Sequence, residues 1–182
     1  MDENTSQPSS WVMRFAPLIA PGASVLDVAC GGGRHLRALA GRGLRLHGVD
    51  RDACALQQAS DVASVRVADL EADPWPYPGQ HFDALIVTRY LWRPLLPTLL
   101  DALAPGGVLL YETFALGQHT LGRPRNPEFL LRPGELLDWA HGRLRVVAFE
   151  DGFIEQPAPA FIQRLCAVAP TVGGPAHPKY NL

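Results

Sequence analysis

Cysteine and lysine are scarce in this sequence. The three cysteines, Cys30, Cys54 and Cys166, lie far apart, and no two of them form a C-x-x-C pair. Neither a disulfide framework nor a cysteine-based zinc site is indicated, and we expect no metal. Lys179 is the only lysine, so arginine carries nearly all of the positive charge. This bias is typical of a GC-rich bacterial genome.

Long apolar runs and a large net charge are also missing. No apolar stretch approaches the roughly 20 residues that a membrane span needs. The first ten residues are acidic and polar, unlike a signal peptide. The formal net charge is -2, so no global field favours nucleic acid. These absences predict a soluble, cytoplasmic protein without a membrane partner.

Strand-like and helix-like segments alternate along the 182 residues, of which 47% are apolar. Such alternation predicts an α/β fold, a doubly wound Rossmann-like sheet of about seven strands with helices on both faces. The sheet should be mostly parallel, with an antiparallel hairpin strand at the C-terminal end. We expect a single domain over 1–182, with 1–10 as a loose tail. The expected strands are 24–29, 44–50, 62–69, 82–88, 108–114, 144–154 and 160–169, and the expected helices are 9–20, 34–43, 51–60, 94–107 and 133–142.

A glycine-rich turn, "VLDVACGGGRH" at 25–35, follows the first expected strand. In a doubly wound sheet, ligands bind at the carboxyl ends of the strands, where the strand order reverses. Glycines there expose bare backbone, and the next helix offers free N–H groups. The dinucleotide pattern G-x-G-x-x-G fails, because counting from Gly31 puts Leu36 at the third glycine. The P-loop pattern fails as well, since no G-K-[ST] follows.

The turn resembles motif I of the class I S-adenosylmethionine-dependent methyltransferases, D/E-x-G-x-G-x-G. Asp27, Ala29, Gly31 and Gly33 match it, with alanine as a mild departure at the first glycine. The chain is also loosely similar to small bacterial methyltransferases of the tellurite-resistance type. The resemblance covers about 20–170. It implies S-adenosylmethionine as methyl donor and S-adenosylhomocysteine as product.

Acidic residues after the next two strands extend the resemblance. Asp50 can accept both ribose hydroxyls with its two carboxylate oxygens. In the resembled family the position of Asp69 meets the adenine amino group, and the next residue, Leu70, packs on the ring. Helix capping by Asp50, a turn at Asp69 and bonding of Asp27 to the N–H groups of its own turn are the structural alternatives. The expected cofactor-binding residues are Asp27, Ala29, Cys30, Gly31, Gly33, Asp50, Arg51, Asp69, Leu70 and Thr88.

The methyl acceptor leaves a weaker signal, because the sulfonium already activates the methyl group and the protein mainly aligns the acceptor. The chain reads "TRYLWRP" where an [ND]-P-P-[YF] motif would indicate methylation of base or glutamine amino groups. No cysteine lies where cytosine C5 methylation would need one. A small-molecule acceptor is therefore favoured, and nucleic acid is not expected.

Candidate acceptor residues follow the fourth and fifth strands. In the resembled fold, the Gly- and Pro-rich loop 115–132 can cover the acceptor side, and its arginines could hold a carboxylate or phosphate. Equally, these arginines could simply tie the loop to the body, His119 could be a surface residue, and Trp92 could pack in the core. The catalytic candidates are Tyr90, Glu112 and His119, and the substrate-binding candidates are Arg89, Tyr90, Trp92, Arg123 and Arg125.

These observations predict an enzyme that transfers a methyl group from S-adenosylmethionine to a small molecule by in-line displacement. One alternative is a catalytically silent adenosylmethionine-binding or partner subunit. A second is an RNA methyltransferase, which would need a basic surface. Such a surface could come from convergence of Arg123, Arg125, Arg132, Arg143 and Arg145. The sequence does not predict the oligomeric state.

Overall fold

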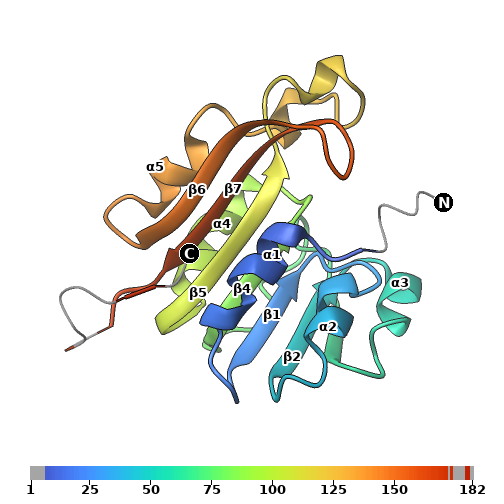
Figure 1. Cartoon of the computed structure of the whole chain (residues 1–182). Helices are drawn as coiled ribbons and strands as arrows, with labels where there is room; N and C mark the ends of the chain where they lie inside the picture. The colour runs from blue at the N-terminus through green and yellow to red at the C-terminus, as the bar shows by residue number, and fades with distance from the viewer. Residues whose placement is uncertain (1–6, 172, 174–178, 181–182) are drawn as a thin grey trace.

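The computed structural model describes residues 7–171, 173 and 179–180, which form one seven-stranded sheet (Figure 1). The spatial order of the strands is β3-β2-β1-β4-β5-β7-β6. They are β1 (Ser24–Val28), β2 (Arg45–Asp50), β3 (Ser64–Val67), β4 (Phe82–Thr88), β5 (Leu103–Phe114), β6 (Arg145–Ile154) and β7 (Ala160–Val168).

The sheet is parallel from β3 to β5, and β7 runs antiparallel to both of its neighbours. The chain winds outwards from β1 to β3 and then crosses to β4 on the other side of β1. The strand order therefore reverses between β1 and β4, which is where doubly wound folds bind ligands. This arrangement confirms the predicted fold class, including the antiparallel hairpin strand.

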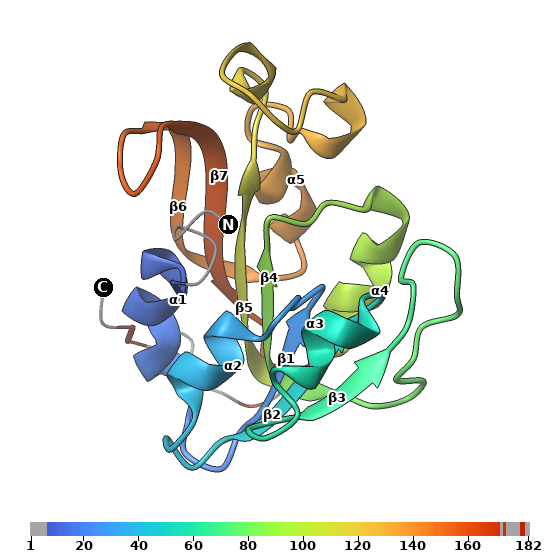
Figure 2. The ribbon, with the colours of Figure 1, turned by 90° about the vertical axis from the view of Figure 1, so that its right-hand side faces the viewer.

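Helices cover both faces of the sheet (Figure 2). Alternate residues of the central strands feed the two cores: Val25 packs with α1 to α3, and Leu26 with α4 and α5. No helix in the described part of the chain is long and apolar enough to cross a bilayer. The helices are α1 (Ser10–Phe15), α2 (Arg34–Leu39), α3 (Ala53–Gln57), α4 (Leu96–Asp101) and α5 (Glu135–Ala140), with 3-10 turns η2 (Ala16–Leu18), η3 (Arg93–Leu95), η4 (Gln118–Thr120) and η5 (Pro127–Phe129).

The main boundary error concerns β5. The stretch 103–107 was expected to close a helix, but it already belongs to the strand. The register between β4 and β5 shifts between Phe82 and Ala84, and this irregularity accommodates Pro105 and the following glycines within a strand. The helices are shorter than predicted, because the backbone leaves helical geometry early; Ala40, for example, is extended.

The N-terminal tail ends earlier than expected. Residues 1–6 of the expected tail lie outside the described residues. Ser9, however, caps α1, since its hydroxyl accepts the N–H groups of Trp11 and Val12. Its own N–H donates to Nε2 of His35 at 3.2 Å. Ser9 is therefore fixed against the start of α2, so the structure corrects the expected tail at this residue.

The segment 115–132 rises from the carboxyl end of β5 and is mostly irregular, as its glycines and prolines predict (Figure 2). It contains the two 3-10 turns η4 and η5. Its ends are pinned together, because Ala115 and Leu131 form a β-bridge and the Leu116 N–H donates to the Leu131 carbonyl. The segment is thus a closed loop, and the Phe161 N–H on β7 also donates to the Gln118 side chain within it.

Candidate functional site

The glycine-rich turn combines an open position with a packed one. Gly31 has φ +53°, and a Cβ added there would meet nothing within 4 Å. Gly33 has φ +72°, and an added Cβ would collide with the Ala59 side chain after α3. Gly33 thus serves the packing of α2 beside α3, whereas Gly31 leaves exposed backbone for a ligand. Ala29 also has positive φ, at +53°.

Asp50 ties the end of β2 to this turn. Its Oδ2 accepts the Gly31 N–H at 2.7 Å, and its Oδ1 accepts the Asp52 N–H at 2.9 Å. The cap of α3 is Asp52, whose carboxylate accepts the N–H groups of Cys54 and Ala55. The capping alternative for Asp50 is therefore wrong. Each oxygen of its carboxylate keeps a second lone pair for a ligand.

A cavity of about 250 Å³, the β2–β3 cavity, opens at the carboxyl ends of β1, β2 and β3. It brings several predicted cofactor residues together with two predicted acceptor residues. Its lining consists of Ala29, Asp50, Arg51, Ala68, Asp69, Leu70, Glu71, Arg89 and Tyr90.

Asp69 fills two roles at the rim of this cavity. It sits in a turn, as the alternative proposed, because its Oδ1 accepts the Glu71 N–H and its N–H donates to Asp73. It also lines the cavity, where Arg51 lies 4.0 Å from its carboxylate. Leu70 is mostly buried in the core and lines the same wall. The turn therefore presents a carboxylate beside an apolar side chain.

Asp27 does not bond the N–H groups of its own turn, contrary to that alternative. It is 1% exposed, and its Oδ2 lies 3.2 Å from Nδ1 of His35. Because Nε2 of His35 accepts the Ser9 N–H, Nδ1 carries the proton and donates to Asp27. The sequence analysis missed His35. The only indication in the sequence was that His35 is the second residue of the expected helix 34–43, which follows the turn.

Cys30 and Thr88 lie next to the site but face away from the cavity. The Cys30 sulfur packs beneath the turn, 2.9 Å from where a Cβ on Gly48 would lie. Burial raises the pKa of this thiol, so it is a neutral core group. The Thr88 hydroxyl accepts Nη2 of Arg34 at 3.2 Å. Neither side chain lines the β2–β3 cavity.

Two larger cavities continue from the first. The loop cavity, of about 740 Å³, lies under the segment 115–132, and the hairpin cavity, of about 880 Å³, lies beside the β6–β7 turn. Arg89 lines all three cavities, so it stands at their junction. Tyr90 lines the β2–β3 and loop cavities, and Arg123 lines the loop and hairpin cavities.

Tyr90 carries an unsatisfied hydroxyl. Its Oη is buried and has no hydrogen-bond partner among the described residues. Burial, then the carboxylates of Glu71 and Asp69, raise the pKa of Tyr90, so the hydroxyl keeps its proton at neutral pH. A buried donor without a partner is costly unless a ligand or water satisfies it. This hydroxyl without a partner belongs to Tyr90, which lines the β2–β3 cavity.

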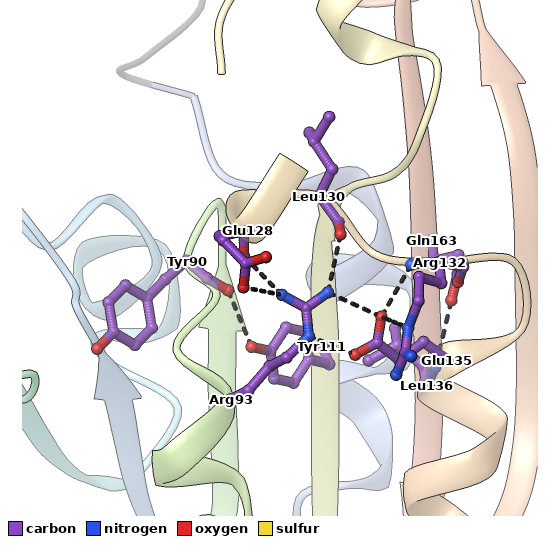
Figure 3. A network of polar contacts seen from close by, with 9 residues as sticks. All are labelled: Tyr90, Arg93, Tyr111, Glu128, Leu130, Arg132, Glu135, Leu136 and Gln163. Carbon is purple, nitrogen blue, oxygen red and sulfur yellow. Dashed lines mark hydrogen bonds and ion pairs between the residues drawn. The ribbon is translucent and has the colours of Figure 1, made fainter. Parts of the chain in front are cut away.

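The loop 115–132 is held to the body mainly by Arg93, which the sequence analysis passed over (Figure 3). Its guanidinium donates to Glu135 at 2.7 Å and to the Leu130 carbonyl at 2.9 Å. Arg132 also donates to Glu135, through its backbone N–H at 2.8 Å. Of the candidate loop arginines, Arg132 is an anchor, whereas Arg123 and Arg125 line the loop cavity.

Two of the catalytic candidates are placed poorly for acid–base work. Glu112 is ion paired with Arg164 at 3.4 Å, although it does line the hairpin cavity. His119 is exposed on η4 and lines none of the three cavities. Trp92, a substrate-binding candidate, packs against the core and lines none of them either. Within the described residues, no group of three or more His, Cys, Asp or Glu side chains could hold a metal ion.

The arginines considered for RNA binding do not converge. Arg143 pairs with Asp101, and Arg145 lies over the Tyr180 ring. Arg145 begins β6, whereas Ile154 at the other end of β6 lines the hairpin cavity. A strand of this length separates the two ends by about 30 Å. Arg143 and Arg145 therefore cannot form one surface with Arg123.

Comparisons with known proteins agree with this architecture. A family model described as "Methyltransferase domain" matches residues 25–107. No curated protein matches the sequence. Among solved structures, TehB from Haemophilus influenzae has a TM-score of 0.76 at 17% identity, over 92% of this chain and 64% of that one. The chain thus spans less than two thirds of that relative.

Two further structures are matched over most of both chains. A TehB-like SAM-dependent methyltransferase from Corynebacterium glutamicum has a TM-score of 0.65 at 20% identity, covering 91% of each chain. The N-methyltransferase NodS from Bradyrhizobium japonicum has a TM-score of 0.66 at 16% identity, covering 93% of this chain and 99% of that one. Residues 25–107 thus match a methyltransferase family, and the chain as a whole shares the fold of these solved methyltransferase structures.

Proposed function

We propose that the protein transfers a methyl group from S-adenosylmethionine, bound in the β2–β3 cavity, to a small molecule bound in the loop and hairpin cavities. The observation that carries this proposal is the junction at Arg89, where a small cavity with three carboxylates meets two large ones. The larger volumes lie in the range that suits small-molecule ligands. All seven strands belong to one sheet, which supports a single domain over 1–182.

The residues of the β2–β3 cavity fit the donor. Asp50 has lone pairs free for ribose hydroxyls, and Asp69 can accept the adenine amino group beside Leu70. The orphaned Tyr90 hydroxyl is a buried donor at the same cavity. The open face of Gly31 allows close approach to the backbone. The carboxylates of this cavity also suit a ligand that carries a positive sulfonium.

The protein's task in the reaction is alignment. When bound, S-adenosylmethionine supplies an activated methyl group: the acceptor's lone pair forms the bond to the methyl carbon while the electrons of the C–S bond return to sulfur. The wall formed by Arg89 and Tyr90 lies between donor and acceptor cavities, so these residues hold the two partners in line. An acceptor atom that bears a proton loses it to water, since the candidate bases Glu112 and His119 are paired or remote.

The two alternatives are less well supported. An RNA acceptor needs a continuous basic surface, and Arg132, Arg143 and Arg145 are instead engaged elsewhere. A silent subunit would not need cavities that open directly beside the donor site. That reading predicts saturable donor binding without S-adenosylhomocysteine formation over a broad panel of acceptors.

The decisive test is calorimetric titration of S-adenosylmethionine and S-adenosylhomocysteine into Asp50→Ala and a matched control. Asp61→Ala removes a carboxylate whose side chain is 73% exposed and lines none of the three cavities. We expect Asp50→Ala to weaken binding of both ligands at least tenfold, because a charge-assisted bond is worth about 1.5–3 kcal/mol. Asp61→Ala should bind like the wild type.

Circular dichroism and thermal melting must first show that Asp50→Ala is folded, since Asp50 also holds the Gly31 N–H. Unchanged affinity in the folded variant would remove Asp50 from the donor site. Failure of the folded wild-type protein to bind either ligand would overturn the proposed function itself.

A further inference from the structure

One wall of the hairpin cavity, the N-terminal wall, consists of residues 7–10, far in sequence from the rest of its lining. This wall leads into α1, which packs beside α2 on one face of the sheet (Figure 2). The Ser9 N–H donates to Nε2 of His35 at 3.2 Å, and His35 is the second residue of α2. Among the described residues, this is the one hydrogen bond that joins the wall to an element other than α1.

The bond to Ser9 requires a neutral His35. Nε2 can accept the Ser9 N–H only while it carries no proton of its own, so the single proton of the ring is on Nδ1. Nδ1 donates to Oδ2 of Asp27 at 3.2 Å. A second proton, on Nε2, would set two donors against each other, and the bond to Ser9 would be lost. The N-terminal wall is therefore held by the neutral imidazole alone.

Asp27 favours the opposite charge state of His35. Its side chain is 1% exposed, and its Oδ1 is buried without a hydrogen-bond partner among the described residues. A buried carboxylate that receives one bond from a neutral ring is poorly compensated, whereas an imidazolium would pair with its charge. The two contacts of His35 therefore compete, because Ser9 needs the neutral ring and Asp27 gains from the charged one.

The other titratable and charged side chains on the elements around His35 do not bond its ring. They are Cys30 and Asp50 beside the turn, Arg34 and Arg37 on α2, Arg14 on α1, Glu112 on β5 and Arg164 on β7. The arginines and the two carboxylates are engaged with other partners. Burial raises the pKa of the Cys30 thiol, which stays neutral. Asp27 and Ser9 thus make the direct polar contacts that decide the charge of His35.

Loss of the Ser9 bond would affect the hairpin cavity and leave most of its lining in place. Residues 7–10 all line the cavity, together with the carboxyl end of β5 and the turn between β6 and β7. The strands β5, β6 and β7 stay paired with one another whatever the state of His35. Ser9 would remain attached to α1 through its cap, so the N-terminal wall can move relative to α2 without unfolding the sheet.

We propose that His35 is a pH-sensitive latch for the N-terminal wall. The neutral ring holds Ser9 and keeps this side of the hairpin cavity closed, and the protonated ring turns its charge to Asp27 and releases the wall. Histidine suits this role because its charge changes closer to neutral pH than that of other side chains. The inference rests on the proposed function for the meaning of the cavity, since it makes access to the acceptor side depend on pH.

NMR of the full-length, ligand-free protein from about pH 8 to about pH 5.5, the range in which histidine titrates, tests the latch without a substitution. At the upper end, the imidazole nitrogens of His35 should show the neutral form with the proton on Nδ1. As the pH falls, the titration of these nitrogens and the loss of protection at the Ser9 amide should share one midpoint. The Ser9 protection factor, corrected for intrinsic exchange, should fall about tenfold, because one hydrogen bond is lost.

Two substitutions separate the acceptor from its titration. His35→Gln keeps an acceptor oxygen for the Ser9 N–H but cannot be protonated, so the Ser9 amide should stay protected over the whole pH range. His35→Leu removes the acceptor, and protection should be low at every pH. His119→Gln is the matched control, because His119 is exposed and lines none of the three cavities, and its Ser9 titration should equal that of the wild type. Circular dichroism checks that each variant is folded.

The latch is wrong if neutral His35 carries its proton on Nε2, if His35 stays neutral over the whole range, or if it titrates without a change at Ser9. A Ser9 amide that loses protection equally in His35→Gln would contradict it as well. The measurements on the wild type decide the question even if a variant does not fold. Failure of the proposed function would look different, because calorimetry would then show no donor binding, whereas the NMR titration needs no ligand.

Discussion

At the scale of single residues, the glycine-rich turn balances strain against packing. Ala29 has the left-handed backbone conformation at the position where the family motif has glycine. An L-residue in that conformation costs about 1–2 kcal/mol. Gly33 has a similar φ, but the Ala59 side chain occupies the space that a Cβ on Gly33 would need. Replacing Ala29 with glycine should therefore stabilise the fold, whereas replacing Gly33 with alanine should destabilise it.

We predict that Ala29→Gly raises the free energy of unfolding by about 0.5–1 kcal/mol, the relief of strain less the extra entropy of the unfolded glycine. Gly33→Ala should lower it by at least about 2 kcal/mol, since it adds both strain and a collision. Urea denaturation of both variants measures these values. Destabilisation by Ala29→Gly would show that the alanine methyl group has a packing role.

The sequence could place Asp50 and Asp69 near the turn because both lie at the carboxyl ends of expected strands, and both line the β2–β3 cavity. Their contact with the donor stays a prediction. It could not identify His35, Arg93 or the orphaned Tyr90 hydroxyl, because their roles depend on partners distant in the chain. His35 bridges Ser9 and Asp27, and Arg93 meets Glu135 more than forty residues away. Such contacts arise from the packing of elements and leave no local pattern.

At the scale of elements, Arg93 and Glu135 join η3 to the start of α5 and so fix the end of the loop 115–132 (Figure 3). Glu135 is 1% exposed. Burial by itself raises the pKa of Glu135, but hydrogen bonds from Arg93 and Arg132 outweigh it, and the net pKa lies below 4.5. The ionised form is thus stabilised by folding.

A carboxylate with a depressed pKa stabilises the fold above its unfolded pKa and loses this contribution as the pH falls through its folded pKa. We predict that Glu135→Gln lowers the free energy of unfolding at pH 7 by about 3 kcal/mol, the lower end for breaking a buried pair because Arg93 is partly exposed. The difference from wild type should shrink as the pH falls below 4.5.

Denaturation measures the free energy of unfolding of wild type and Glu135→Gln at pH 7 and again below pH 4.5. Glu128→Gln is the matched control at both pH values. Its carboxylate faces the same Arg93 at 3.8 Å, but its side chain is 81% exposed. An exposed pair contributes about 0–1 kcal/mol, so this variant should change little. Equal effects of the two substitutions would mean that burial of Glu135 does not determine the strength of the anchor.

The strands were easier to predict than the helices for a physical reason. The run 82–88 is buried on both faces and apolar almost throughout, so its limits are clear in the sequence, and β4 has those limits. The start of β5 was missed because Pro105 and its two glycines are typical of a turn, and only the irregular pairing with β4 allows them in a strand.

At the scale of the whole molecule, the site joins elements from across the sheet. The β2–β3 cavity is lined by the ends of β1, β2, β3 and β4, so a ligand bound there stabilises contacts among four strands. Any ligand that binds only the folded state raises its stability by mass action.

We predict that S-adenosylhomocysteine at 100 times its dissociation constant stabilises the fold by about 2.7 kcal/mol. For a chain of this size, that corresponds to a rise in melting temperature of about 5–10 °C. Differential scanning fluorimetry measures the shift, and Asp50→Ala, with its affinity lowered at least tenfold, should show no more than about half of it at the same ligand concentration. A shift of the same size in Asp50→Ala would place the stabilising contacts elsewhere.

The order of the strands also separates two groups of residues along the chain. The residues proposed for the donor lie between Asp27 and Tyr90, inside the stretch that matches the methyltransferase family. The β5, β6 and β7 side of the hairpin cavity, proposed for the acceptor, comes from residues after 107. Under the proposed function, substitutions in the second half should alter which molecule is methylated while leaving the donor site intact. For protein engineering, the hairpin and the loop 115–132 can be exchanged or diversified on an unchanged donor-binding half.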